Sequence, residues 1–371
     1  MTQKLFEACT KGDLNTIKSI LSKGADVNYN NKSGTTPLMQ SCIVNILEVA
    51  KILIDNGANI DYQSNDGLTA LMHSVANNSE ITKILVENRV DVNFQDNTGM
   101  TALMHLPRNN NIENQAEFLI ENGADIHIKD NVGNNALMHS AKGNNINDVR
   151  LLIANGAKVN DSNGADANGE ICVPTNAFFI ACTNGNFEIA DLLADNGADI
   201  IFEDTWGRSL LSQAAYLGNY KATEYLINKG VGVELNCSEG KTALMESASS
   251  FYVNNDCIEL LIKNGASVNA QDENGDTALH LTLDQFLYDN AEVLIRNGAQ
   301  IDIVNKEGVS VSDILNEKID EDNDLEAKYL MGLVISMSER ELLLPDVTDQ
   351  EDYPLEILSH TDAAVPLVVA T

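Results

Sequence analysis

Apolar and polar residues follow a pattern along this chain that restarts about every 33 residues. A typical period opens with a short apolar run such as Thr-Ala-Leu-Met at 69–72, where threonine suits a helix N-cap and the next residues favour a helix. Asparagine or glycine then breaks the run, as at Gly185–Asn186. A second apolar stripe follows at helical spacing, as at Val49 and Leu53. The pattern predicts a pair of short helices in each period.

A four-residue signature of the form Gly-Ala-Asp-Val marks the end of each helix pair. Its successive occurrences are 33, 32, 34, 33, 41, 33, 35 and 33 residues apart. The Asn-Gly at the end of the second apolar stripe supplies a left-handed helix C-cap. In the segment that follows, such as 91–99, apolar and polar residues alternate and turn residues end it, as in a β-hairpin. The signature begins at Gly24, Gly57, Arg89, Gly123, Gly156, Gly197, Gly230, Gly265 and Gly298.

A second motif keeps the same register as the first. It reads GTTPLM from Gly34, GLTALMH from Gly67, GMTALMH from Gly99, GNNALMH from Gly133, GKTALM from Gly240 and GDTALH from Gly275. These segments resemble the GxTPLH motif of ankyrin repeats, and a period near 33 agrees with that family. The resemblance implies an all-α-rich repeat solenoid, in which helix-turn-helix units are linked by β-hairpin fingers.

The resemblance covers residues 1–335. A single unit cannot cover its own apolar face, so the units are expected to stack and share one core. Residues 1–30 lack the TPL segment and suit an N-terminal cap, and 306–335 keep two helical patterns without the motif and suit a closing cap. The long spacing of 41 predicts an acidic finger insertion at 161–170. Residues 336–371 form an acidic and apolar tail that binds a partner, folds back on the array or is disordered.

Composition points to a soluble, ordered chain. Its 371 residues exceed the roughly 250–300 at which one compact core stops growing. Six cysteines lie far apart without a CxxC pair and are expected to be reduced. Neither a signal peptide nor a membrane helix is expected, so we predict a cytoplasmic or otherwise intracellular protein, with a host cell as a possible location if it is an effector.

The formal net charge of −32 restricts the partners. The field of the chain would repel phosphate backbones and anionic membranes, so we expect no direct nucleic-acid or membrane contact and a basic protein as partner. Negative charge is denser at the C-terminal end, where residues 306–371 carry −12 against −20 for the preceding 305 residues. Solvation of the surface accounts for such charge as well as a binding role does.

Three histidines, His73, His105 and His139, occupy the same helix position in consecutive units. Equivalent residues of stacked helices are about 10 Å apart, whereas zinc needs nitrogens about 2.1 Å from one ion, so no metal site is predicted. Packing or hydrogen bonding is the favoured interpretation and partner contact the alternative. His280 lies one position earlier, at the usual histidine of the family, where the resemblance implies a hydrogen bond that supports the finger.

Aromatic residues form a second candidate site in the fingers. Tyr29, Tyr62, Phe94 and Phe202 share one position, and Trp206 is expected near the tip of its finger. Stacking between fingers and contact with a partner both explain the shared column, because aromatic residues are common in cross-strand pairs and in binding hot spots. For Trp206 we favour partner contact.

These observations favour a protein–protein interaction module whose concave face and fingers bind, and inhibit or scaffold, a partner protein. The alternative is an acidic nucleic-acid mimic that blocks a DNA- or RNA-binding protein, for example as a viral or pathogen effector against a host or defence protein. No nucleophile–base spacing, phosphate loop or HExxH motif is present, so neither enzyme activity nor a cofactor is expected. We expect a monomer or a hetero-complex.

The shared core gives a first test. Truncation of Leu71 to alanine should destabilise the protein by about 2–5 kcal/mol, because the stacked units leave a cavity there. Urea unfolding of both proteins measures the change. A loss below about 1 kcal/mol would place Leu71 outside the core.

Overall fold

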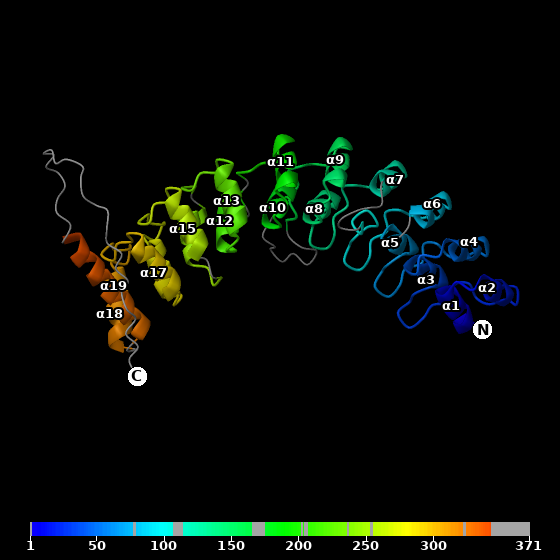
Figure 1. Cartoon of the computed structure of the whole chain (residues 1–371), viewed down its shortest axis with the longest axis horizontal. Coiled ribbons are helices and arrows are strands. Elements are labelled where there is room, and N and C mark those ends of the chain that lie inside the picture. Colours follow the sequence, from blue (N-terminus) through cyan, green and yellow to red (C-terminus); the bar gives the residue numbers. More distant parts are fainter. Residues whose placement is uncertain are drawn as a thin grey trace, which may run out of the picture.

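The computed structural model describes residues 2–76, 79–106, 114–164, 175–201, 203, 207–235, 237–252, 255–321 and 324–342. These residues form helices that follow one another in pairs (Figure 1). We number the pairs as units 1 to 10 in chain order; in unit 4, residues 102–105 form turns where other units have the first helix. The helices are α1 Thr2–Lys11, α2 Leu14–Leu21, α3 Pro37–Ile43, α4 Leu47–Asp55, α5 Ala70–Val75, α6 Ser79–Glu87, α7 Gln115–Glu121, α8 Ala136–Lys142, α9 Ile146–Ala154, α10 Ala177–Thr183, α11 Phe187–Asp195, α12 Leu210–Tyr216, α13 Tyr220–Asn228, α14 Ala243–Ala248, α15 Asn255–Lys263, α16 Ala278–Asp284, α17 Tyr288–Arg296, α18 Val311–Glu321 and α19 Leu325–Leu342, with a 3₁₀ turn at Ser238–Gly240.

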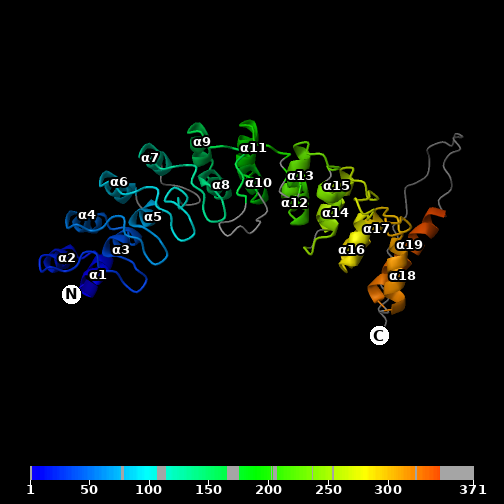
Figure 2. The same cartoon turned by 180° about the vertical axis from the view of Figure 1, so that it is seen from behind.

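The units stack into a curved array. Figures 1 and 2 show the second helices α4, α6, α7, α9 and α11 on the outside of the curve. The first helices α3, α5, α8 and α10 lie on the inside, and the finger loops extend from the same side. First helices contact the first helices of neighbouring units, as α3 contacts α5 and α12 contacts α14. The paired-helix solenoid expected from the sequence is therefore confirmed.

Local sequence sets where the first helices begin. Thr69 is the N-cap of α5, and its hydroxyl accepts a hydrogen bond from the Met72 backbone N–H at 3.3 Å. Thr277 has the same role at the start of α16. Asn135 and Ser209 replace threonine in units 5 and 7 and accept the corresponding bond. A short polar side chain thus satisfies a free N–H at the start of these helices, as the sequence predicts.

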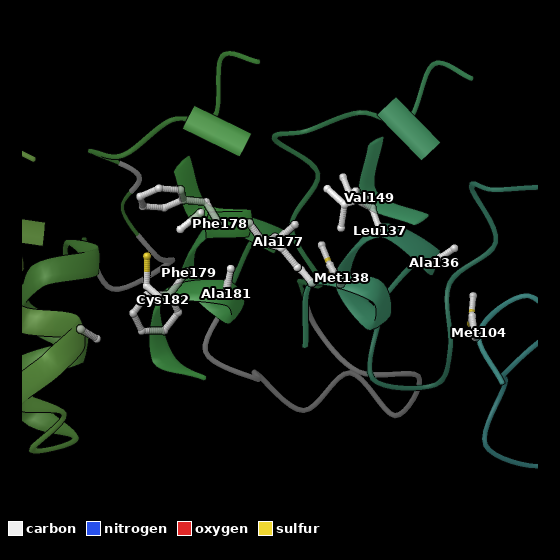
Figure 3. Packing of buried hydrophobic residues seen from close by; sticks show 14 of the residues in the cluster. Met104, Ala136, Leu137, Met138, Val149, Ala177, Phe178, Phe179, Ala181 and Cys182 are labelled. Atoms are coloured by element: carbon white, nitrogen blue, oxygen red, sulfur yellow. The ribbon is translucent and has the colours of Figure 1, made fainter. Parts of the chain in front are cut away.

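One continuous core runs through the described units. Leu71 on the first helix and Ile81 on the second helix of unit 3 are both at most 1% exposed. Figure 3 shows an interface farther along the array, where Met138 of unit 5 lies beside Ala177 of unit 6. Because buried residues of successive units belong to one cluster, each unit depends on its neighbours for burial.

The fingers are closed turns stacked on one another. In unit 4, Asp96 N–H donates to Met100 C=O at 3.0 Å and so closes the finger. Asn97 N–H then donates to Asp66 C=O of the preceding finger at 3.0 Å. Instead of the continuous strands of a β-hairpin, the described residues show three isolated antiparallel bridges, such as Val304–Ser310. The fingers are too short for a longer ladder before the next helix begins.

An asparagine in the signature segment bridges consecutive units. Asn93 Oδ1 accepts a hydrogen bond from Asp125 N–H at 2.8 Å, and its Nδ2 donates to Gly123 C=O at 2.9 Å. Asn160 and Asn269 make the same pair of bonds with the units that follow them. Asp61 accepts the equivalent bond from Asp91 N–H at 2.9 Å, although a carboxylate has no N–H to donate. One amide therefore satisfies two backbone groups of the next unit.

Three local details refine the sequence prediction. The closing helix α19 continues past residue 335 to Leu342, so our cap boundary was too early. The good helix formers Glu-Arg-Glu-Leu at 339–342 favour this extension. Arg89 takes the left-handed conformation that glycine has in the other signatures, with φ of 65°.

Of the predicted insertion at 161–170, residues 165–170 lie outside the described residues, as do tail residues 343–371.

Close finger stacking makes glycine indispensable at one kind of position. Gly99 has φ of +81°, and a Cβ there would lie 2.6 Å from the backbone nitrogen of Asn131 in the next finger. Gly123, at a helix end, has φ of +93° with no heavy atom within 4 Å of an added Cβ. Gly123→Ala should cost about 1–2 kcal/mol of backbone strain, and Gly99→Ala about 2–5 kcal/mol because the neighbouring finger must also move. Chemical denaturation of the two variants measures the difference, and equal losses would contradict tight finger stacking.

Candidate functional site

One position of the first helices stays partly accessible while the residues around it are buried. In unit 3, His73 is half-buried, whereas Leu71, Met72 and Ser74 are at most 4% exposed. The residues at this position differ from unit to unit, and we call them the inner column. They are Gln40, His73, His105, His139, Ile180, Gln213, Glu246 and Leu281, of which Gln213 alone is fully buried.

The fingers hold two of these histidines in place. His105 Nε2 lies 2.7 Å from Asp96 Oδ2, with the histidine side chain 26% and the aspartate side chain 5% exposed. The other oxygen, Asp96 Oδ1, accepts hydrogen bonds from the N–H groups of Thr98 and Met100 at 2.8 and 3.0 Å. Burial raises the pKa of Asp96, but hydrogen bonds from the Thr98 hydroxyl and from His105, together with those from the two N–H groups, outweigh it and the net pKa is below the usual range. Asp96 therefore shapes the finger with one oxygen and fixes His105 with the other.

Unit 5 repeats this arrangement. His139 Nε2 lies 2.7 Å from Asp130 Oδ2, and Asp130 Oδ1 accepts from the N–H groups of Val132 and Asn134. The pKa of Asp130 is again lowered, because hydrogen bonds from His139 and Asn134 outweigh the opposing effect of burial. Packing or hydrogen bonding was the favoured interpretation of the three histidines, and His105 and His139 each show such a hydrogen bond. Because the aspartates belong to fingers, the pairs also place the inner column beside the fingers, inside the curve.

His73 has a different environment. Ser64 stands where units 4 and 5 have Asp96 and Asp130, and its hydroxyl accepts from Leu68 N–H at 3.1 Å. Burial lowers the pKa of His73, and the nearby His105 lowers it further. The fold thus opposes protonation of His73.

In unit 9, the histidine does not bind the finger aspartate. Asp272 Oδ1 accepts from the N–H groups of Asn274 and Asp276, as in the other fingers. The inner-column residue here is Leu281, and Asp272 Oδ2 is buried without a hydrogen-bond partner. His280, one position earlier, is fully buried; its Nδ1 lies 2.8 Å from Thr277 Oγ1, and its Nε2 lies 3.3 Å from Val309 C=O in the next finger. His280 therefore supports a finger, as the resemblance implied.

The aromatic finger column is only partly described. Tyr29, Tyr62 and Phe94 are half-buried, and Tyr62 and Phe94 pack against the common core. Asn30 Nδ2 donates to the Tyr62 hydroxyl at 2.5 Å, which ties two neighbouring fingers together. Phe202 and Trp206 lie outside the described residues. The choice between stacking and partner contact stays a prediction for all of them.

Comparison with known proteins identifies the repeat. The family described as ankyrin repeats in three copies matches residues 5–96, 76–163, 162–236, 178–272 and 211–305. These overlapping matches cover most of the 371 residues. The chain is an ankyrin-repeat protein.

Relatives of this ankyrin-repeat protein carry the array in different settings. E3 ubiquitin-protein ligase KEG of Arabidopsis thaliana is 30% identical over 123 residues, which are 33% of this chain and 8% of that relative. Ankyrin repeat and KH domain-containing protein 1 of Homo sapiens is 35% identical over 107 residues, 28% of this chain and 4% of the relative. An ankyrin repeat protein of Rickettsia felis is 34% identical over 130 residues, 33% of this chain and 54% of the relative. The chain thus spans between 4% and 54% of the lengths of these relatives.

The described part of this ankyrin-repeat protein has neither a metal-binding cluster nor a membrane-spanning helix. Its residues contain no group of three or more His, Cys, Asp or Glu side chains able to hold a metal ion. No described helix combines the length and the apolar character needed to cross a bilayer.

Sequence reasoning missed a third group of surface residues, at the turns between the two helices of units 8 and 9. Phe251, Tyr252 and Phe286 are 75%, 56% and 61% exposed. A signal was present, because Phe286 occupies a turn position where Asn144, Gly185 and other units have asparagine or glycine. Comparing that turn across units would have revealed it.

The missing aspartate of unit 3 gives a titration test. Ser64→Asp should provide His73 with the carboxylate that His105 and His139 have, and so raise the pKa of His73. With its present lowered pKa, His73 makes the fold lose stability as the pH falls through about 6.5, and the variant should reduce that loss. NMR titration of the histidine Cε1–H signals measures the pKa, with Ser64→Asn as the uncharged control. An unchanged pKa in Ser64→Asp would show that the finger geometry of units 4 and 5 does not extend to unit 3.

Proposed function

We propose that this ankyrin-repeat protein is a binding module, without catalytic activity, that holds a protein partner against its fingers and inner column. The variation within the inner column supports this proposal most directly. Buried positions repeat the same residue types, such as Leu71, Leu137 and Leu244, whereas the half-exposed position changes from histidine to isoleucine to glutamate. A repeated scaffold with a variable accessible position in most of its units can be specific for one partner surface.

Fixed side chains add to the suitability of this face for binding. Asp96 and Asp130 hold His105 and His139 in single orientations, so little rotational freedom would be lost when a partner binds. The same contacts argue against an enzyme, because each aspartate uses its remaining oxygen to shape a finger. The Thr98 hydroxyl donates to Asp96 Oδ1 at 2.6 Å, so it is bound to the aspartate and not to the histidine that would have to act as its base.

Charge supports a partner with a basic surface. The chain carries a formal charge of −32, and carboxylates such as Asp66 and Glu273 are exposed on the fingers. Opposite charges accelerate association, and their contribution falls as salt screens it. A basic face would therefore bind this array quickly and in a salt-sensitive way.

Site-specific photo-crosslinking tests the face and its chemistry together. A photoreactive residue at His73 or Glu246 of the inner column should capture the same protein, with yields roughly tenfold lower when salt is raised from about 50 to 300 mM. Lys83 on α6 and Lys263 on α15, in the same two units, are the outer-face controls. Equal capture from the controls would contradict the inner face as the binding surface, and salt-independent capture would contradict a basic partner.

A further inference from the structure

A shallow groove of about 320 Å³ lies where the inter-helix turns of units 8 and 9 meet the start of α19. Its lining is aromatic and acidic: Phe251, Tyr252, Phe286 and Tyr288 contribute rings, and Asp289 and Glu326 contribute carboxylates, beside Asn255, Leu287 and Asn290. The inter-helix turns are at the ends of the helices away from the fingers, so this groove is separate from the inner column.

Exposed aromatic residues continue from the groove onto unit 7. The rings of Tyr216 and Tyr252 meet edge to face, with centroids 6.3 Å apart and planes at 84°. Leu217 and Tyr220 beside them are 45% and 39% exposed. Three consecutive units therefore present large apolar side chains at their inter-helix turns, and a contiguous apolar patch of this kind marks an interaction site.

The backbone of Phe286 is the second, independent observation. Phe286 has φ of 60°, in the left-handed region that bulky residues adopt only at an energetic cost. The equivalent turn residues that the structure describes in units 1, 2, 5, 6 and 7 are glycine or asparagine, which tolerate that region: Gly12, Asn45, Asn144, Gly185 and Gly218. With its side chain 61% exposed, burial offsets little of that cost.

The ring of Phe286 already binds a cation within the chain. Lys318 Nζ lies 3.7 Å from its centroid, and the ring of Tyr288 approaches it at 6.4 Å with an interplanar angle of 74°. Aromatic faces attract cations of this kind through the ring quadrupole. Two groove-lining carboxylates, Asp289 and Glu326, outweigh the single positive charge of Lys318 and leave this region able to accept a further cation.

From these features we propose that the groove, together with the aromatic turns of unit 7, is a second docking site for a peptide segment of a partner. The segment carries an apolar or aromatic side chain flanked by arginine or lysine. The apolar side chain contacts Phe251 and Tyr252, and the cationic groups contact the Phe286 ring, Asp289 and Glu326. The C-terminal tail of the chain itself fits this chemistry poorly, because residues 343–371 include acidic side chains and no lysine or arginine.

An NMR titration of the full-length chain tests the site. The probe is an eight-residue peptide in which two arginines flank a leucine–phenylalanine pair, and a second peptide has both arginines replaced by glutamate. The arginine peptide should shift the backbone amide signals of Phe251, Tyr252, Phe286 and Glu326 saturably, and the glutamate peptide should not. Absence of these shifts, or equal shifts from both peptides, would overturn the proposal.

Variants separate binding from structure. Phe286→Asn should weaken the arginine peptide at least tenfold while leaving the melting temperature unchanged or higher, because asparagine tolerates the left-handed turn. Asp289→Asn combined with Glu326→Gln should weaken binding and its salt dependence. Val132→Asn, which removes an exposed apolar side chain from a finger, should leave this peptide unaffected. A Phe286→Asn variant that melts lower and binds normally would assign Phe286 a structural role instead.

A last comparison concerns the tail. A chain that ends at Leu342 should bind the arginine peptide as the full-length chain does. Binding that appears only after residues 343–371 are removed would show that the tail occupies the groove, and would overturn the assignment to a partner.

Discussion

Each helix pair of this protein has an apolar face that only the next unit can cover, and the rest of the structure follows from that constraint. Leu71 and Ile81 are buried because neighbouring units stack on both sides of them. Stacking at the helices also brings the fingers so close that Gly99 has no room for a Cβ beside Asn131. The same closeness lets Asn93 reach two backbone groups of the next unit. Burial and hydrogen bonding therefore select the same spacing between units.

This coupling explains why most of the fold could be predicted from sequence. Local preferences recur in register: Thr69 as an N-cap, the left-handed glycines and the apolar stripes. A wrong prediction in one unit is therefore corrected by comparison with the other units. The end of α19 could not be placed in this way, because no following unit sets its length. Its last residues are helical by their own propensity and not by the repeat.

The candidate sites were harder to predict, because a side chain's partner depends on neighbouring residues at unrelated sequence positions. His73, His105 and His139 look equivalent in the sequence, yet two of them bind a finger aspartate, and the third has Ser64 at the position of that aspartate. The sequence contained that difference nine residues upstream of each histidine. The separation of nine residues becomes interpretable only once the finger is known to fold back onto the first helix.

Regular repeats also make departures from the scaffold easier to interpret than in an irregular fold. A position with one structural requirement in every unit should have residues that meet it, as glycine and asparagine do at the inter-helix turn. Phe286 fails to meet it and gains little burial in return. Arg89 also takes a left-handed angle without glycine, and nothing in the structure explains its choice. Strain therefore indicates a function only where a second feature, such as the acidic aromatic groove at Phe286, gives the strained side chain something to bind.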